Sequence, residues 1–232
     1  MNTVAPAPAE DELALAIASF KSGDYPTAFP FFSALAEAGN MEAQAWLGSF
    51  YANGTGGVAP SLPKALAWYI RAAGQGHVQA ATNVGAMLAM GQGARQDRAE
   101  GAKWLAQAAE RGDPMAQYNL ATLLSKGDGV PVDNKRAADL YRRAAETGHF
   151  PSQARLGYFY ANGLGVEKNR IAAFAWLSLA ARHGIGIALT ALESLVADMS
   201  GEEKKRGLGL AQKFQSQMAS GTAPPTINPI PG

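Results

Sequence analysis

The chain has 232 residues, of which 47% are hydrophobic and 17% charged, and its formal net charge at pH 7 is +1. This composition supports a sizeable core, and the near-neutral balance without a long basic run argues against nucleic acid as the main partner, because phosphate binding needs clustered lysine and arginine. The sequence contains no cysteine, which excludes disulfides, iron–sulfur clusters, cysteine-ligated zinc and thiol nucleophiles.

The N-terminal segment, residues 1–9, is rich in alanine and proline, and we expect it to be flexible. Acidic residues follow at 10–12, where a secretory signal would need a basic start and an apolar stretch. The longest apolar run, at 171–181, is shorter than the about 20 residues that span a bilayer. We therefore expect no membrane insertion and a cytoplasmic protein, or a periplasmic one if a leader has been removed.

The middle of the chain repeats itself with a period of 36 residues, once 37. Two glycine columns and a tryptophan or leucine column keep this register. Their members are Gly39, Gly76, Gly112, Gly148 and Gly184; Gly54, Gly91, Gly127 and Gly163; and Trp68, Trp104, Leu140 and Trp176. The agreement of several columns in one register predicts a repeat protein with the tryptophan column in its core.

Each unit is predicted to be a pair of helices. In the first helix, Leu47 and Tyr51 lie on one face, and Gly48 between them removes bulk where a neighbouring helix comes close. Glycine of the second column then ends this helix as a left-handed cap. The second helix begins at a residue of a strong N-cap type. These residues are Ser61, Asp97, Asp133 and Asn169, and the register extends back to Asp24.

The register divides the chain into a leading helix pair at 10–40, four units at 41–77, 78–113, 114–149 and 150–185, and a closing pair at 186–218. Ser200-Gly-Glu-Glu203 is a capping box that opens the last helix. The final residues, 219–232, hold four prolines, and we expect a flexible tail. The expected fold is all-α, an α-solenoid of about six antiparallel helix pairs whose atypical terminal pairs cover its ends.

The pattern A-x-x-x-L-G-x-x-Y-x-x-G-x-G-V, followed by K-A-x-x-W-x-x-x-A-A-x-x-G, resembles the Sel-one-like repeat (SLR) family, whose members are related to tetratricopeptide repeats. The best copies lie at 43–76 and 154–184, and the resemblance covers residues 10–218. It implies a right-handed superhelix and a non-catalytic adaptor for a protein or peptide, typically in a bacterial signalling or envelope-related assembly. Some secreted bacterial relatives carry a disulfide in every unit, and this chain departs from that branch.

Several patterns imitate catalytic or cofactor motifs. Gly54-Thr-Gly56 and its counterparts resemble part of a dinucleotide loop, but they follow helices and recur with the repeat. Ser61-Leu-Pro-Lys64 matches the S-x-x-K of β-lactamases without the motifs that accompany it. His77 and His149 share a column two units apart, too far for one metal ion, and are interpreted as polar residues beside the unit-ending glycines. We therefore predict no enzyme activity, no cofactor and no metal site.

In tetratricopeptide-like solenoids, the first helix of each unit lines the concave face. The positions around the Leu-Gly pair that packing leaves free are therefore expected to bind an extended peptide. The predicted binding residues are Trp46, Asn83, Tyr118, Asn119, Lys126, Arg155 and Tyr158. Asparagine can pair both the N–H and the C=O of a peptide unit, and arginine can bind a carboxylate through two hydrogen bonds.

Two other functions stay open beside that of a monomeric scaffold with a protein or peptide partner. A carbohydrate or cell-wall-polymer binder would expose aromatic residues along one face, for which Trp46, Phe50, Tyr158 and Phe159 are candidates. An enzyme such as a cell-wall hydrolase or amidase would need a convergent nucleophile and acid/base set, and the sequence pattern indicates none.

Overall fold

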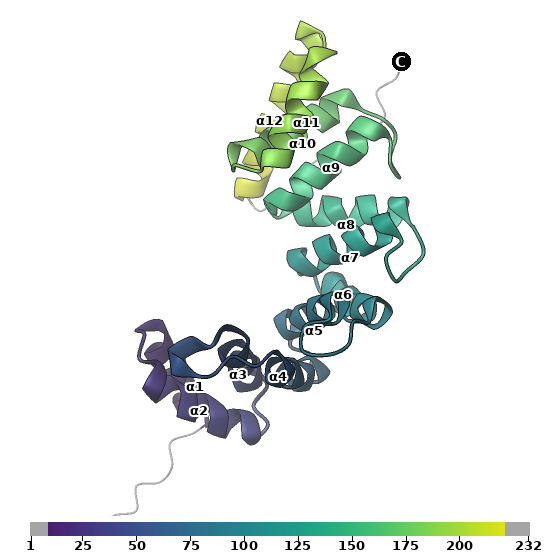
Figure 1. Ribbon diagram of the computed structural model, residues 1–232. Coiled ribbons are helices and arrows are strands. Elements are labelled where there is room, and N and C mark those ends of the chain that lie inside the picture. Colours follow the sequence, from purple (N-terminus) through teal and green to yellow (C-terminus); the bar gives the residue numbers. More distant parts are fainter. Residues whose placement is uncertain (1–8, 221–232) are drawn as a thin grey trace, which may run out of the picture. The chain divides into compact units, whose positions relative to one another are not determined.

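The computed structural model describes residues 9–220, and every regular element in that range is a helix (Figure 1). Its twelve α-helices are α1 (Ala9–Lys21), α2 (Tyr25–Glu37), α3 (Met41–Asn53), α4 (Leu62–Gly74), α5 (Val78–Met90), α6 (Arg98–Glu110), α7 (Pro114–Lys126), α8 (Asn134–Glu146), α9 (Phe150–Asn162), α10 (Arg170–Arg182), α11 (Gly186–Ala197) and α12 (Gly201–Ser220). A short 3-10 turn, η1 (Thr55–Gly57), comes after α3. None of these described helices is both long and apolar enough to cross a membrane.

The predicted flexible ends, 1–9 and 219–232, lie outside the described residues except where they join the terminal helices. Ala9 is the first residue of α1, and Ser220 is the last residue of α12.

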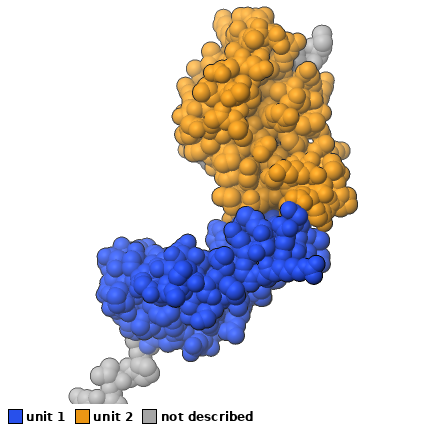
Figure 2. Space-filling model, viewed as in Figure 1, with its two compact units in different colours: residues 1–108 blue, residues 109–232 orange. Residues whose placement is uncertain are grey.

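The chain forms two compact units, one ending at Ala108 and the other beginning at Ala109 (Figure 2). Within the first unit, each helix from α1 to α5 packs against the next in chain order, and α7 to α10 do the same in the second. Such packing is typical of an α-solenoid, in which each repeat contacts its sequence neighbours. The prediction of an all-helical solenoid is confirmed.

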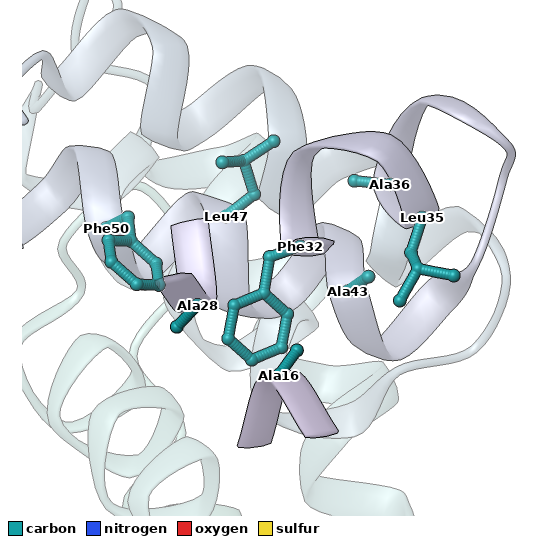
Figure 3. Close-up of a cluster of buried hydrophobic side chains, with 8 residues drawn as sticks. All are labelled: Ala16, Ala28, Phe32, Leu35, Ala36, Ala43, Leu47 and Phe50. Carbon is teal, nitrogen blue, oxygen red and sulfur yellow. The ribbon is translucent and has the colours of Figure 1, made fainter. Parts of the chain in front are cut away.

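The leading helix pair is joined to the rest of the first unit by an aromatic core between α1, α2 and α3 (Figure 3). Phe32 and Phe50 are fully buried in it, and Phe20 meets Phe50 edge-on with 5.5 Å between ring centroids. Burying one such ring fully contributes about 1.5–3 kcal/mol. The leading pair is therefore an integral part of the first unit.

Three of the four regular helix pairs are closed by a side chain of the second helix that lies on a glycine of the first. A Cβ atom added at Gly48 would lie 2.7 Å from the Tyr69 ring, and one added at Gly85 would lie 2.6 Å from Leu105 Cγ. In the fourth pair, a Cβ atom added at Gly157 would lie 2.7 Å from Leu177 Cγ. We call the second-helix residues at this register position the contact column: Tyr69, Leu105, Tyr141 and Leu177. The prediction that the Leu-Gly glycines allow close helix approach is confirmed.

The turn between the two helices of each repeat unit depends on glycines with positive φ. The four glycines of the second column are left-handed C-caps, as predicted, with φ between 67° and 72°. A second glycine occurs two residues later and packs on the start of the preceding unit's second helix, since a Cβ at Gly93 would collide with the Leu62 carbonyl oxygen. Gly165 meets Asn134 in the same way. The Gly-x-Gly motif is therefore a packing turn.

The predicted N-caps of the second helices are confirmed except at Ser61. Each of the others accepts a hydrogen bond from the backbone N–H three residues later: Asp24, Asp97, Asp133 and Asn169. Ser61 occupies the same place before α4, but its hydroxyl makes no capping hydrogen bond.

The last helix covers one side of α10. Phe214 of α12 stacks on Trp176 with 4.2 Å between ring centroids. The predicted capping box at its start is confirmed, because the Ser200 N–H donates to Glu203 Oε2 at 2.8 Å and the Glu203 N–H donates to Ser200 Oγ at 3.2 Å.

The prediction that the whole tryptophan column lies in the core is wrong for two members. Trp176 is 1% exposed because α12 covers it, whereas Trp68 and Trp104 are half-buried. At Trp68 the Arg71 guanidinium lies over the ring, 4.5 Å from its centroid. The register identifies equivalent positions, but their burial depends on which later helix packs over them.

Two glycines of α12 give a matched test of close packing. A Cβ at Gly207 would lie 2.5 Å from Phe174 Cδ1 on α10, whereas nothing lies within 4 Å of one at Gly209. Gly207→Ala should lower the free energy of unfolding by about 1–3 kcal/mol through overpacking. Gly209→Ala should raise it by about 0.4–1 kcal/mol, because alanine restricts the unfolded chain. Chemical denaturation of both variants checks this, and equal effects would contradict the packing described.

Candidate partner-binding surface

The first helices begin at a column of N-cap positions that includes two histidines: Asn40, His77, Asp113 and His149. All but His149 accept a capping hydrogen bond with the side chain. His77 Nδ1 accepts a hydrogen bond from the Ala80 N–H at 3.1 Å, so the ring proton lies on Nε2. That nitrogen faces Glu42 Oε2 on α3, 3.2 Å away. The interpretation of His77 as a polar residue beside the unit-ending glycine missed this role. Asn40 and Asp113 occupy the same register position in other units and are common N-cap types, so the sequence contained a signal for this cap.

Buried glutamines join successive units. Gln44, Gln117 and Gln153 are 5%, 2% and 1% exposed. Their side-chain amides donate to carbonyls in the last turn of the preceding second helix, at 3.1–3.2 Å. These bonds fix α3, α7 and α9 against the helix pair that precedes each of them. The glutamines were not among the residues predicted from the sequence, although two of them lie 36 residues apart in register.

Trp46 is packed more closely than predicted. Its ring stacks on Phe32 with 5.4 Å between centroids and meets Phe20 at 4.6 Å. Its indole N–H donates to Glu42 Oε1 at 3.0 Å. Trp46 is therefore only partly free of packing, because the leading helix pair surrounds one side of it with aromatic side chains.

Trp46 and Asn83 nevertheless meet at one cavity. A cavity of about 310 Å³ lies between α3, α4 and α5, and its wall also includes Ser49 and Tyr69. Burial raises the pKa of Tyr69, and the nearby side chains of Ser49 and Asn83 oppose this rise. A member of the contact column thus reaches from the second helix to the polar positions of two first helices.

In the second unit, Tyr118 lies beside Tyr141, the next tyrosine of the contact column. The Tyr141 hydroxyl is 3.0 Å from Thr122 Oγ1, and the ring centroid of Tyr118 is 5.8 Å from that of Tyr141. Burial raises the pKa of Tyr141, and the nearby positive charge of Arg155 opposes this shift. Two repeat units after Tyr69, the same arrangement of tyrosine and hydroxyl therefore recurs, with an arginine in the place of Asn83.

The other predicted binding residues are spread along the second unit. Asn119 is half-buried on α7, and Lys126 is exposed at the end of that helix. Tyr158, 47% exposed, lines a separate cavity of about 620 Å³ together with Lys168 and Arg170. The structure therefore brings the predicted residues together in small groups: Trp46 with Asn83, and Tyr118 with Arg155 around Tyr141.

The aromatic face considered for carbohydrate binding does not exist as predicted. Phe50 and Phe159 are 0% and 3% exposed, and Trp46 packs in the first core. Of the four candidates only Tyr158 is exposed, because the other rings fill spaces between adjacent helices. Among the described residues, no group of three or more histidine or acidic side chains could hold a metal ion.

Comparison with known proteins identifies the repeat. The family model of the Sel1 repeat matches residues 42–77, 78–113, 114–149 and 151–185. The chain belongs to the Sel1 repeat family. Proteins of this family generally act as protein-interaction scaffolds, and the predicted resemblance to SLR proteins is confirmed.

Solved structures agree with this assignment. A protective antigen of uropathogenic Escherichia coli with an SLR fold is similar at 25% identity and a TM-score of 0.82 over 97% of this chain, which spans only 51% of that protein's length. A Sel1 repeat protein from Oxalobacter formigenes is similar at 28% identity and a TM-score of 0.73, over 90% of this chain and 84% of that one. An immunity protein from Pseudomonas aeruginosa shares the fold at 20% identity and a TM-score of 0.52, over 100% of this chain and 95% of that one. No protein of curated function matches the sequence.

His149 predicts a pH dependence of stability in this Sel1 repeat protein. Burial lowers the pKa of this ring below its ordinary value of 6.5, and the charge of Asp113 opposes the shift. As the pH is lowered through 6.5, this histidine binds a proton more readily in the unfolded chain than in the folded one. The free energy of unfolding therefore decreases until the pH lies below the pKa of the ring in the folded protein. His149→Asn places a residue of a good N-cap type at this position, and its side chain does not titrate. Its melting temperature should therefore fall less than that of the wild type between about pH 8 and about pH 5, and equal falls would contradict this account.

Proposed function

We propose that this Sel1 repeat protein is a non-catalytic scaffold whose first helices bind a segment of a partner protein. The observation that carries the proposal is the cavity between α3, α4 and α5, where side chains of two successive first helices converge. Repeat units offer equivalent positions at regular steps, which suits an extended segment better than a compact ligand. The general role of the family supports the same conclusion.

The polar groups of the proposed surface have the chemistry for peptide recognition. Asn83 and Asn119 each carry an amide donor and acceptor that can pair with a peptide backbone. Arg155 is half-buried, its Nε makes no hydrogen bond within the described part of the chain, and its guanidinium suits a carboxylate. We propose that Tyr118, Lys126 and Tyr158 of the second unit also contact the partner.

The enzyme alternative has weaker support. A serine–histidine pair exists in the described range, with Ser152 Oγ 2.8 Å from His149 Nδ1. Ser152 is fully buried at the start of α9, so no substrate reaches its hydroxyl. The two structures at 25% and 28% identity are bacterial SLR proteins, and we propose a bacterial signalling or envelope-related assembly as the setting of the scaffold.

Combined substitution of three predicted binding residues on the first helices tests the proposal. Asn83→Ala, Asn119→Ala and Arg155→Ala together should abolish capture of the partner in an affinity pull-down read by mass spectrometry. The free energy of unfolding should fall only modestly, by about 1 kcal/mol for each intramolecular hydrogen bond lost.

The matched control removes three exposed polar side chains from second helices, through Gln107→Ala, Lys135→Ala and Arg136→Ala. This variant should capture the partner as well as the wild type does. Unchanged capture by the first-helix variant, or equal loss in both, would contradict a binding surface on the first helices.

A further inference from the structure

Glu42 is held in position at the cavity of the first unit, yet it keeps room for a ligand. Its Oε1 accepts the Trp46 indole N–H at 3.0 Å, and its Oε2 faces His77 Nε2 at 3.2 Å. The side chain is nevertheless 43% exposed. Each carboxylate oxygen has two lone pairs, so both oxygens can accept a further hydrogen bond. Fixing the carboxylate in advance lowers the entropy lost when a ligand binds.

The other walls of the cavity also suit a positively charged hydrogen-bond donor. Trp46 presents an aromatic ring that is braced by Phe32, and a cation is attracted to the face of such a ring. Asn83 and Ser49 add side-chain oxygens beside Tyr69 in the same wall.

The charge of the cavity is negative. Glu42 is the one carboxylate among the nine residues that line it, and none of the nine is lysine or arginine. His77 does not cancel this charge, because its Nδ1 accepts the Ala80 N–H and the ring then carries a single proton.

We propose that this cavity binds the cationic side chain of an arginine or lysine in the partner segment. The cation donates to Glu42 and lies against Trp46, and Asn83 pairs with a remaining donor. The volume, about 310 Å³, is at the small end for ligand cavities and so suits one side chain. The inference rests on the proposed scaffold function and adds the chemistry of one anchor.

The second unit provides a natural contrast. Two repeat units later, Met115 stands in the place of Glu42, and Arg155 stands in the place of Asn83. Tyr141 stands in the place of Tyr69 and forms a hydrogen bond with a neighbouring hydroxyl. The packing arrangement is thus repeated while the charge is reversed, so a cationic ligand is expected at the first unit and not at the second.

A titration of the full-length, ¹⁵N-labelled protein tests the proposal, with the Trp46 indole N–H as the NMR reporter, assigned through Trp46→Phe. The probe is acetyl-Gly-Arg-Gly-amide, and the same peptide with citrulline or glutamate at the centre is the control. The arginine peptide should shift the reporter and bind about tenfold or more tightly than the citrulline peptide, because a charge-assisted hydrogen bond is lost with the charge. The glutamate peptide should not shift it.

Glu42→Gln should weaken binding of the arginine peptide about tenfold. Glu37→Gln, which removes an equal charge from an exposed position on α2, should not change it. Equal binding of arginine and citrulline peptides, equal effects of the two variants, or no shift at any concentration would overturn the proposal. If the arginine peptide does not bind while partner capture still depends on Asn83, Asn119 and Arg155, the scaffold function is supported and only the cation site is contradicted.

Discussion

The close approach of the two helices within a unit is the contact on which the rest of the structure depends. Tyr69 and Leu105 lie on Gly48 and Gly85 at distances that leave no space for a Cβ atom. The lost helix propensity of an interior glycine, about 0.5–1 kcal/mol relative to alanine, is offset by this packing. Because the two helices of a pair pack so closely, the polar side chains of the first helix lie against the next repeat unit. The proposed binding surface is a consequence of the repeat contact.

The identity of the contact residue then determines the local chemistry. Where the contact column carries leucine, the pair is sealed by apolar packing alone. Where it carries tyrosine, the hydroxyl lies among polar side chains of the first helices. Tyr141 forms a hydrogen bond with Thr122, and Tyr69 lies near Ser49 and Asn83. The alternation of tyrosine and leucine places one such arrangement in each compact unit. Glu42 gives the first a negative charge and Arg155 gives the second a positive one.

Much of this fold could be predicted from the sequence, because caps and turns are local. The left-handed glycines, the aspartate and asparagine caps and the Ser200–Glu203 capping box are each determined by a few neighbouring residues, and the structure has them as predicted. The candidate site was harder to predict, because burial on a first helix depends on which units flank it. Trp46 has the same register position as Asn83, yet it is packed by Phe32 of the leading pair. Such differences arise from contacts with residues distant in the sequence, which the repeat period does not predict.

A crystal structure of the protein with its captured partner segment tests the central claim most directly. The account predicts that the segment lies along the first helices, with a cationic side chain within hydrogen-bonding distance of the Glu42 carboxylate in the cavity between α3, α4 and α5. A segment bound to the outer faces of the second helices, with that cavity free of partner atoms, would contradict it.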